Sequence, residues 1–380
     1  MPFSALGLSS SLVKSIDRLG YTKPYPIQEQ AIPAILAGND VLGIAETGSG
    51  KTASFVLPIL QLLQNSPGER SRHVKVLVLV PTRELAVQVA DVFIALGIGL
   101  PHKLKVKAVY GGVSINPQMI DMHGTDILVA TPGRLLDLIS SNAVQLSSVQ
   151  ILVLDEADKM LNLGFRDEMT DIFRLLPKTR QNLLFSATLK DAINDMQEGL
   201  LTNPVKIEIV KEVQNIELIT QKAYKVTDDR KGVLLRYLIK HHDMKQVLVF
   251  VSSTHRADHI VVKLKKNGID AAALHSKKSQ GARTDALKNF KDGKLRVLVA
   301  TDLASRGIDI QFLPYVINYE MPRSPTDYVH RIGRTGRAES PGEAISLIAP
   351  EDEHQFKIVQ KKMKKQVPMT ETDELNLTGF

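Results

Sequence analysis

A glycine-rich segment near the start of the chain carries residues whose types and spacing suit phosphate chemistry. Residues 45–52 read Ala-Glu-Thr-Gly-Ser-Gly-Lys-Thr, directly after the apolar run Val41–Ile44 and before a helical pattern. The two glycines allow a tight turn whose backbone N–H groups face a phosphate, and the positive end of the following helix adds to the attraction. Lys51 can reach the β- and γ-phosphates, and the Thr52 hydroxyl can bind Mg²⁺. The segment therefore predicts a phosphate-binding loop, in which Ala45 stands where such loops usually begin with glycine.

A run of acidic residues, Asp155-Glu156-Ala157-Asp158, can supply the carboxylates that nucleotide hydrolysis needs. It follows the apolar run Ile151–Leu154, and parallel strands present such residues at the carboxyl edge of the sheet, where open α/β folds bind ligands. Asp155 would hold Mg²⁺ through water, and Glu156 would polarise the attacking water. Standing alone, an acidic tetrapeptide after a strand is more often the start of a helix. Its pairing with the phosphate loop favours a nucleoside triphosphatase instead.

Alternating strand and helix patterns would position these residues. The apolar runs are continuous, which is typical of parallel strands that are covered on both faces. The expected strands are Val41–Ile44, Val74–Val80, Ile127–Ala130, Ile151–Leu154, Leu183–Phe185, Val247–Val251, Ala271–Leu274, Val297–Ala300 and Tyr315–Asn318, and the expected helices include Ala53–Gln64, Glu84–Ala95, Arg256–Lys266 and Gly281–Phe290. The alternation predicts an α/β fold. Residues 127–131 (Ile-Leu-Val-Ala-Thr) resemble residues 297–301 (Val-Leu-Val-Ala-Thr), which indicates two related halves.

The composition is that of a folded protein with more than one domain. The 380 residues are 43% hydrophobic and 23% charged, and at about 150 residues per domain this length suggests about two or three domains. No cysteine is present, which excludes disulfides, thiolate metal sites and a thiol nucleophile. No apolar run reaches the ~18 residues of a membrane span, and the first residues do not resemble a secretory signal. We therefore expect a cytoplasmic protein without a membrane partner.

Positive charge is concentrated in the second half of the chain. Residues 1–210 hold 19 Lys and Arg against 20 Asp and Glu, whereas residues 211–380 hold 29 against 21. A basic domain often faces a polyanion such as a nucleic acid, but a lysine-rich solvated surface explains the excess about as well.

The acidic run spells the signature of the DEAD-box ATP-dependent RNA helicases, and the resemblance extends from about Phe3 to about Pro350. Gly20-Tyr21 and the residues up to Gln28 resemble the family's Q motif, with Tyr21 where Phe is frequent. Further motifs follow in the family's order at residues 81–86, 111–112, 131–134, 186–188, 249–253, 280–283, 300–309 and 330–337. The compact core and the Leu-Gly-Phe at residues 163–165 are most similar to the bacterial RhlE-type branch, without the long basic extension common there.

This resemblance implies two tandem RecA-like domains, each a mostly parallel sheet flanked by helices. We expect residues 1–210 to form the N-terminal ATP-binding domain with the Q motif. Residues 211–380 would form the C-terminal helicase domain with a short polar tail after Pro368. The connection is expected near residues 210–217, which are largely polar.

The resemblance also implies that the nucleotide is ATP, bound with Mg²⁺. Gln28 carries an amide that both donates and accepts hydrogen bonds, as an adenine edge requires, and Phe3 would stack on the adenine ring. A core position is the alternative for Phe3. The expected ATP contacts are Phe3, Tyr21, Gln28, Ala45, Glu46, Thr47, Gly48, Ser49, Gly50, Lys51, Thr52, Gly307 and Asp309, and the expected metal ligands are Thr52 and Asp155.

Catalysis and its coupling to RNA are expected to involve both domains. Arg334 and Arg337 resemble the family's arginine fingers, which stabilise charge on the γ-phosphate. The expected catalytic residues are Lys51, Asp155, Glu156, His330, Arg334 and Arg337, and the expected coupling residues are Asp158, Ser186, Thr188 and Arg331. Ser186 and Thr188 would join Asp155 or Asp158 to His330. Arg331 would pair with the acidic run, and a solvated basic helix is the plainer alternative.

RNA is the expected partner, and it would be bound through its backbone. Hydroxyls, N–H groups and arginines at strand ends suit phosphate and ribose contacts, which carry no base sequence. Aromatic residues make up only 5% of the chain, so platforms for base stacking are scarce. The expected RNA contacts are Pro81, Thr82, Arg83, Gly112, Thr131, Pro132, Gly133, Arg134, Arg283 and Thr301.

The expected activity is ATP-dependent unwinding of short RNA duplexes, or remodelling of RNA–protein complexes, through closure of the two domains. Because ATP and RNA would favour the same closed state, their affinities must be coupled. An ATP-gated RNA clamp that scaffolds an assembly is the alternative. A DNA helicase would instead be stimulated as strongly by DNA as by RNA. Proteins of ribosome assembly or RNA decay are open as partners.

Overall fold

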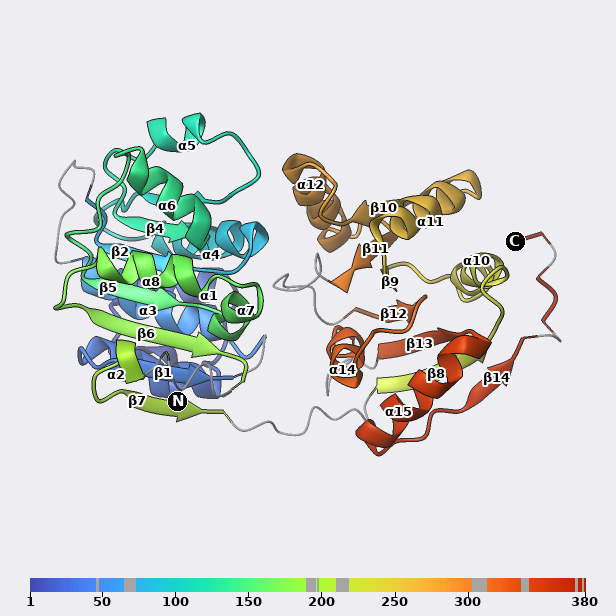
Figure 1. Cartoon of the computed structure of the whole chain (residues 1–380). Coiled ribbons are helices and arrows are strands. Elements are labelled where there is room, and N and C mark those ends of the chain that lie inside the picture. The colour runs from blue at the N-terminus through green and yellow to red at the C-terminus, as the bar shows by residue number, and fades with distance from the viewer. Residues whose placement is uncertain are drawn as a thin grey trace. The chain divides into compact units, whose positions relative to one another are not determined.

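The chain folds into two compact units, Met1–Lys211 and Glu212–Phe380, each built on a seven-stranded sheet (Figure 1). The computed structural model describes residues 1–45, 48–64, 73–188, 196, 198–209, 219–302, 313–335, 342–372, 375–377 and 379–380. The expected connection at residues 210–217 lies outside this part of the chain. The predicted α/β class with parallel sheets is confirmed. Across the residues just given, no helix has the length and apolar character needed to cross a membrane.

In the N-terminal unit the strands lie in the order β3-β4-β2-β5-β6-β1-β7, and every neighbouring pair is parallel. The strands are β1 (Val41–Ile44), β2 (Val76–Leu79), β3 (Val106–Val109), β4 (Ile127–Ala130), β5 (Ile151–Leu154), β6 (Gln181–Ser186) and β7 (Val205–Glu208). Branched apolar residues fill the central strands because both faces of the sheet are buried. The parallel arrangement brings the carboxyl ends of β1, β2, β4 and β5 to one edge, where the candidate functional segments begin.

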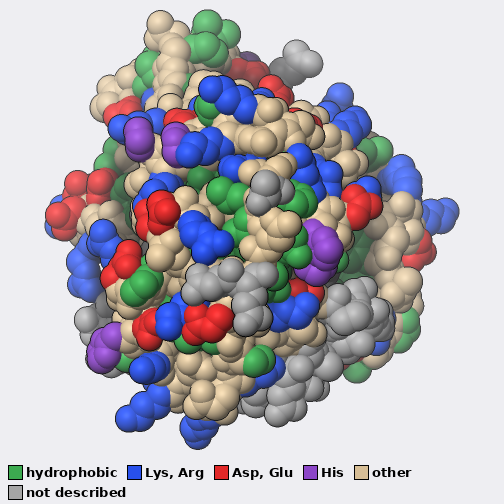
Figure 2. All heavy atoms as spheres, turned by 90° about the vertical axis from the view of Figure 1, so that its right-hand side faces the viewer, with side chains coloured by type: hydrophobic (Ala, Val, Ile, Leu, Met, Phe, Trp, Pro, Cys, Tyr) green, Lys and Arg blue, Asp and Glu red, His purple; other side chains and the backbone are tan. Residues whose placement is uncertain are grey.

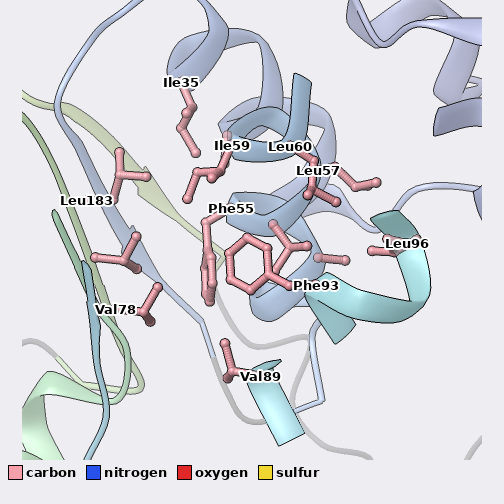
Figure 3. Close-up of a cluster of buried hydrophobic side chains, with 14 of the residues drawn as sticks. Ile35, Phe55, Leu57, Ile59, Leu60, Val78, Val89, Phe93, Leu96 and Leu183 are labelled. Carbon is pink, nitrogen blue, oxygen red and sulfur yellow. The ribbon is translucent and has the colours of Figure 1, made fainter. Parts of the chain in front are cut away.

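Helices cover both faces of this sheet. They are η1 (Phe3–Leu6), α1 (Ser10–Arg18), α2 (Pro26–Leu36), α3 (Lys51–Leu63), α4 (Arg83–Gly97), α5 (Asn116–Ile120), α6 (Pro132–Ser140), α7 (Ala157–Asn162) and α8 (Arg166–Arg174). One face packs against α1 to α4, where the Phe55 ring lies 6.3 Å from the Phe93 ring between centroids (Figure 3). The Phe185 ring of β6 lies 5.3 Å from Phe55 on the same measure. The other face packs against α6, α7 and α8. Gly43 in β1 is required by this packing, because a Cβ there would lie 2.5 Å from the Phe185 ring.

The C-terminal unit repeats this scheme with the strand order β10-β11-β9-β12-β13-β8-β14, again with parallel neighbours. Its strands are β8 (Ile219–Lys225), β9 (Val247–Val251), β10 (Ala271–Leu274), β11 (Val297–Thr301), β12 (Tyr315–Asn318), β13 (Gly342–Ile348) and β14 (Met369–Glu371). Its helices are α10 (Lys231–His241), α11 (Thr254–Lys266), α12 (Gln280–Lys291), α14 (Pro325–Ile332), η3 (Pro350–Asp352) and α15 (Glu353–Met363). Ser253, Ser279 and Ser324 begin α11, α12 and α14, each accepting a hydrogen bond from a backbone N–H three residues on.

The segment after Pro368 differs from the polar tail expected from the sequence. Met369–Glu371 forms β14, which adds a parallel strand to the edge of β8. Leu375 and Leu377 pack into the core beside α10, and the Phe380 ring meets Tyr237 edge-on at 5.1 Å between centroids. Two leucines in a polar stretch are too weak a pattern to predict this packing from the sequence.

Candidate nucleotide-hydrolysis and RNA-binding site

The predicted phosphate-binding loop leads from β1 into α3 and contains two glycines in the left-handed region. Gly48 and Gly50 both have φ of +87°. A Cβ on Gly50 would also lie 2.5 Å from Nε2 of Gln28, so this position needs glycine for space as well as for its backbone angle. Lys51, the first residue of α3, is 6% exposed, and its Nζ has no hydrogen-bond partner among the described residues. The loop therefore presents a buried ammonium group at the carboxyl end of β1.

Asp155 lies directly after β5, at the same edge of the sheet, and is 2% exposed. Its Oδ1 has no hydrogen-bond partner in the described part of the chain. Burial raises the pKa of Asp155 to about 6, although the positive charge of Lys51 opposes the rise and the charge of Glu156 adds to it. The buried ammonium of Lys51 and the buried carboxyl of Asp155 thus feel each other's charge. Phosphate oxygens and a hydrated divalent cation are the kinds of group that would satisfy both.

Glu156 precedes α7 with a left-handed backbone, at φ of +55°, which is uncommon for a residue other than glycine. Its side chain is 6% exposed, and its Oε1 lies 2.6 Å from Nζ of Lys159 in the next turn. Non-glycine residues held in this region cluster at functional sites, because the surrounding structure must compensate for the strain. The backbone angle and the burial both mark Glu156 as a residue whose position is tightly defined.

The expected coupling residues of the N-terminal unit come together at the end of β6. Thr188 Oγ1 donates a hydrogen bond to Asp158 Oδ2 at 3.2 Å. Ser186 Oγ donates to the Thr188 carbonyl at 2.8 Å. Of the two acidic residues considered from the sequence, Asp158 is thus the one that Thr188 contacts. This turn connects the acidic run to the end of the neighbouring strand.

Gln28 connects the Q-motif segment to the phosphate-binding loop. Its Oε1 accepts a hydrogen bond from the Tyr25 N–H at 2.9 Å, and its Nε2 donates to the Gly50 carbonyl at 3.1 Å. A primary amide has two donors and two acceptor positions, so each end of this buried amide retains one further hydrogen-bonding position. Phe3 is only 5% exposed and belongs to the core beside α1, which is the alternative position that the sequence allowed.

The expected RNA contacts of this unit lie at the carboxyl ends of β2 and β4 and around the glycines that follow β3. Gly112, at φ of +77°, lies against the Arg83 guanidinium, since a Cβ there would be 2.5 Å from Arg83 Nη1. Arg134 donates to the Val113 carbonyl at 2.9 Å and pairs with Asp137. The turn at residues 112–113 thus joins two arginines from α4 and α6. Pro81, Thr82, Thr131, Pro132 and Gly133 flank the starts of these two helices.

In the C-terminal unit, Arg331 forms an ion pair that the sequence did not predict. Its Nε and Nη2 donate to the two carboxylate oxygens of Asp302 at 2.6 and 2.7 Å. Its Nη1 donates to Asn318 Oδ1 and to the Glu320 carbonyl. Arg331 is 2% exposed, so these contacts satisfy a fully buried guanidinium within its own unit. Its partner within this unit is Asp302, which directly follows β11, and the expected pair with the acidic run of the other unit stays a prediction.

Comparison with known proteins agrees with this geometry. Residues 25–196 match the family described as DEAD/DEAH box helicase, and residues 230–339 match the Helicase conserved C-terminal domain. The chain is 40% identical over 366 residues to the ATP-dependent RNA helicase CshA of Listeria monocytogenes, covering 96% of this chain and 69% of that protein. It is 38% identical over 377 residues to the DEAD-box ATP-dependent RNA helicase RhpA of Helicobacter pylori, covering 98% and 75%. This protein is a DEAD-box RNA helicase.

The structural comparison gives the same family. S. cerevisiae Dbp5 bound to RNA and ADP BeF3 is similar with a TM-score of 0.81 and 30% identity, over 98% of this chain and 96% of that one. The predicted tandem RecA-like fold is thereby confirmed. As a member of this family, the DEAD-box protein is an ATP-dependent enzyme that acts on RNA.

Sequence reasoning missed one segment of this DEAD-box protein, the Asn-Tyr-Glu at residues 318–320. Glu320 Oε2 accepts hydrogen bonds from the Ser252 N–H at 2.7 Å and from Ser252 Oγ at 2.6 Å. Its Oε1 accepts from Arg256 Nε at 3.0 Å. Asn318 accepts from Arg331 and donates to Ser346 Oγ. The segment therefore joins the start of α11 to the arginine of α14, and only its place after an apolar strand could have indicated it.

Of the remaining predicted site residues of the DEAD-box protein, some lie in the described part of the chain and others lie outside it. Arg283 and Thr301 are buried, on α12 and at the end of β11, whereas His330 is exposed on α14 and Arg334 lies half-buried in the turn after it. The residues outside the described part of the chain are Glu46, Thr47, Gly307, Asp309 and Arg337. On the face shown in Figure 2, Lys and Arg side chains are interspersed with acidic ones, as on a solvated surface.

Proposed function

We propose that this DEAD-box protein hydrolyses ATP at the edge formed by β1 and β5 and uses the cycle to unwind short RNA duplexes or remodel RNA–protein complexes. The observation that carries the proposal is a pair of buried groups at the carboxyl ends of these strands, Lys51 Nζ and Asp155 Oδ1, which have no hydrogen-bond partner among the residues that the structure describes. Buried polar atoms are normally hydrogen-bonded, and unsatisfied ones mark a place where a ligand completes the site. A nucleoside triphosphate supplies the oxygens that a lysine needs.

We assign Mg²⁺ to the same place, with Thr52 and Asp155 as the residues that would hold it. Hydroxyl and carboxylate oxygens are the ligands that Mg²⁺ prefers, and the unsatisfied Asp155 Oδ1 fits this donor set. When bound, the ion would neutralise part of the phosphate charge.

The remaining steps belong to side chains of this chain. Lys51 would bind the β- and γ-phosphates, and Glu156 would orient the attacking water and accept its proton. Arg334 and Arg337 would supply the positive charge that stabilises the transition state, with His330 as the relay to RNA. ATP and RNA would each favour a closed arrangement of the two units, which couples their affinities.

RNA recognition through the backbone follows from the groups at the strand ends. Arg83 and Arg134 lie at one turn and could contact successive phosphates, as could Arg283 and Thr301 of the other unit. Such contacts hold RNA without reading its sequence. The ATP-gated clamp is not favoured, because the related proteins named above are helicases.

We also propose, on the sequence resemblance, that the protein belongs to the RhlE-type branch and acts in the cytoplasm with proteins of ribosome assembly or RNA decay. The Leu-Gly-Phe at residues 163–165 supports the branch assignment. The bacterial origin of the related helicases supports the proposed setting.

The proposal is tested with Glu156→Gln, which keeps the size of the side chain but removes the base. ATP binding should be retained, whereas RNA-stimulated turnover should fall by about 10² or more. Single-stranded RNA should stimulate the wild type strongly, and DNA of matched sequence should not. A variant that turns over at the wild-type rate would remove Glu156 from the mechanism.

A further inference from the structure

Lys159 is not among the predicted site residues, yet it contacts the residue that should activate water. Its Nζ lies 2.6 Å from Oε1 of Glu156, across the first turn of α7. The Lys159 side chain is 22% exposed and the Glu156 side chain is 6% exposed. The lysine is therefore partly open to solvent, while the carboxylate that it holds is enclosed by protein.

The burial of its carboxylate distinguishes this contact from an ordinary helix-surface ion pair. In the described chain the other ion pairs at this i,i+3 spacing have carboxylates that are 41% to 60% exposed, as in Asp171 with Arg174 on α8. Exposed pairs of this kind contribute little, because water screens them and solvates both partners. A carboxylate enclosed by protein depends much more on the group that holds it.

The contact with Lys159 restrains a carboxylate that the backbone alone does not position. The left-handed backbone at φ of +55° fixes where the side chain leaves the main chain. Glutamate still has three rotatable side-chain bonds, so the backbone alone does not fix its carboxylate. The Lys159 ammonium contacts Oε1 at 2.6 Å and so restrains one of the two carboxylate oxygens.

We propose that Lys159 is a positioning residue for Glu156, and that it holds Oε1 so that Oε2 can accept the proton of the attacking water. This inference rests on the proposed function, in which Glu156 is the base. In the step itself, a water O–H bond breaks and its proton passes to Oε2, while the water oxygen forms the bond to the γ-phosphorus and the bond from that phosphorus to the bridging oxygen of ADP breaks. Lys159 keeps its protons throughout.

Lys159→Met tests the inference in the full-length protein, because it keeps most of the side chain and removes the ammonium. The kcat of RNA-stimulated hydrolysis should fall about tenfold to a hundredfold, the size of effect that misplacing a catalytic group produces. The KM for ATP and the affinity for RNA should stay at wild-type values, whereas the melting temperature should fall, because the enclosed Glu156 carboxylate loses its cation. Lys159→Arg, which keeps the charge, should recover most of the lost kcat.

A matched control and a double variant separate positioning from folding. Arg174→Met removes the exposed i,i+3 pair of α8 and should leave kcat unchanged. In a Glu156→Gln background, Lys159→Met should cause no further loss in the single-turnover rate, because its effect passes through Glu156. A wild-type kcat in Lys159→Met, or an equal loss in the Glu156→Gln background, would overturn the inference. Normal turnover by Glu156→Gln alone would instead refute the proposed base.

Discussion

The buried guanidinium of Arg331 forms a bidentate ion pair with Asp302, whose side chain is 32% exposed, inside the C-terminal unit, with Nε–Oδ1 and Nη2–Oδ2 distances of 2.6 and 2.7 Å. The third nitrogen of Arg331 donates to Asn318 and to the Glu320 carbonyl. One guanidinium thus connects the ends of β11 and β12 to α14. Because α14 also carries His330 and leads into Arg334, the pair determines how these residues are presented.

Asp302→Ala should destabilise the C-terminal unit by about 3 kcal/mol, since it leaves the charge of Arg331 buried without its carboxylate. Urea denaturation followed by circular dichroism measures the free energy of unfolding. Asp292→Ala is the matched control, because its pair with Lys294 is exposed, and it should change stability by less than about 0.5 kcal/mol. Equal effects of the two variants would show that the Arg331 pair contributes no more than a surface contact.

Gly50→Ala should weaken ATP binding by about tenfold or more, because its Cβ would displace the Gln28 amide that contacts the loop. Binding of a fluorescent ATP analogue measures the loss. Gly38→Ala is the control for the backbone angle, since Gly38 also has a positive φ but nothing lies within 4 Å of a Cβ there. That variant should lose stability and keep its ATP affinity. Normal ATP affinity in Gly50→Ala would show that the contact between Gln28 and the loop is not needed for nucleotide binding.

Arg83→Ala should weaken RNA binding about equally for all sequences and reduce the slope of log affinity against log salt by about 1, the expected loss for one phosphate contact. Gly112→Ala should produce part of this effect by displacing the Arg83 guanidinium. Gly124→Ala, at another positive φ with no neighbour within 4 Å, should leave RNA binding unchanged. An unaltered salt slope in Arg83→Ala would place the RNA elsewhere.

Glu320 should make the C-terminal unit less stable in acid. Burial alone would raise the pKa of Glu320, but hydrogen bonds from Ser252 and the charge of Arg256 outweigh it, so the pKa lies below the ordinary 4.5. The unfolded chain then binds protons more readily than the folded one, so this contribution is complete well above 4.5 and is lost as the pH falls through that value towards the folded pKa.

The variant Glu320→Gln tests this dependence. Between about pH 7 and pH 4 its free energy of unfolding should fall less steeply than that of the wild type. Glu351→Gln, at an exposed position, should follow the wild-type curve. Parallel curves for Glu320→Gln and the wild type would show that the Ser252 and Arg256 contacts do not favour the charged carboxylate.

The sequence predicted the central strands well because they are buried on both faces. Val41–Ile44, Ile127–Ala130 and Ile151–Leu154 are continuous apolar runs, and the strands begin and end where the runs do. Strand β8 (Ile219–Lys225), which lies between β13 and β14, was missed. Its polar residues alternate with apolar ones, and its pairing with Gly342–Ile348 joins segments that are far apart in the chain. Such pairings depend on tertiary contacts that no local pattern records.

The residues of the candidate site also include some that the sequence predicted and some that it did not. The spacing in the phosphate loop and the acidic run after a strand indicated where Lys51 and Asp155 would lie, because a parallel sheet brings strand ends together. The partner of Arg331 depends on the packing of α14 across the sheet, which its own sequence does not specify. Glu320 and Lys159 belong to no motif that the sequence analysis found. Only their short distances to Ser252 and Glu156 in the structure show that they contact the site segments.

The strand at Met369–Glu371 has a practical consequence for anyone who trims this protein. A version that stops after α15 would leave the backbone N–H and C=O groups along one side of β8 without their neighbour and would uncover the apolar surface that Leu375 and Leu377 occupy. An unpaired sheet edge beside exposed apolar surface is a template for self-association. Such a truncated enzyme would therefore be expected to aggregate in solution, even with every motif intact.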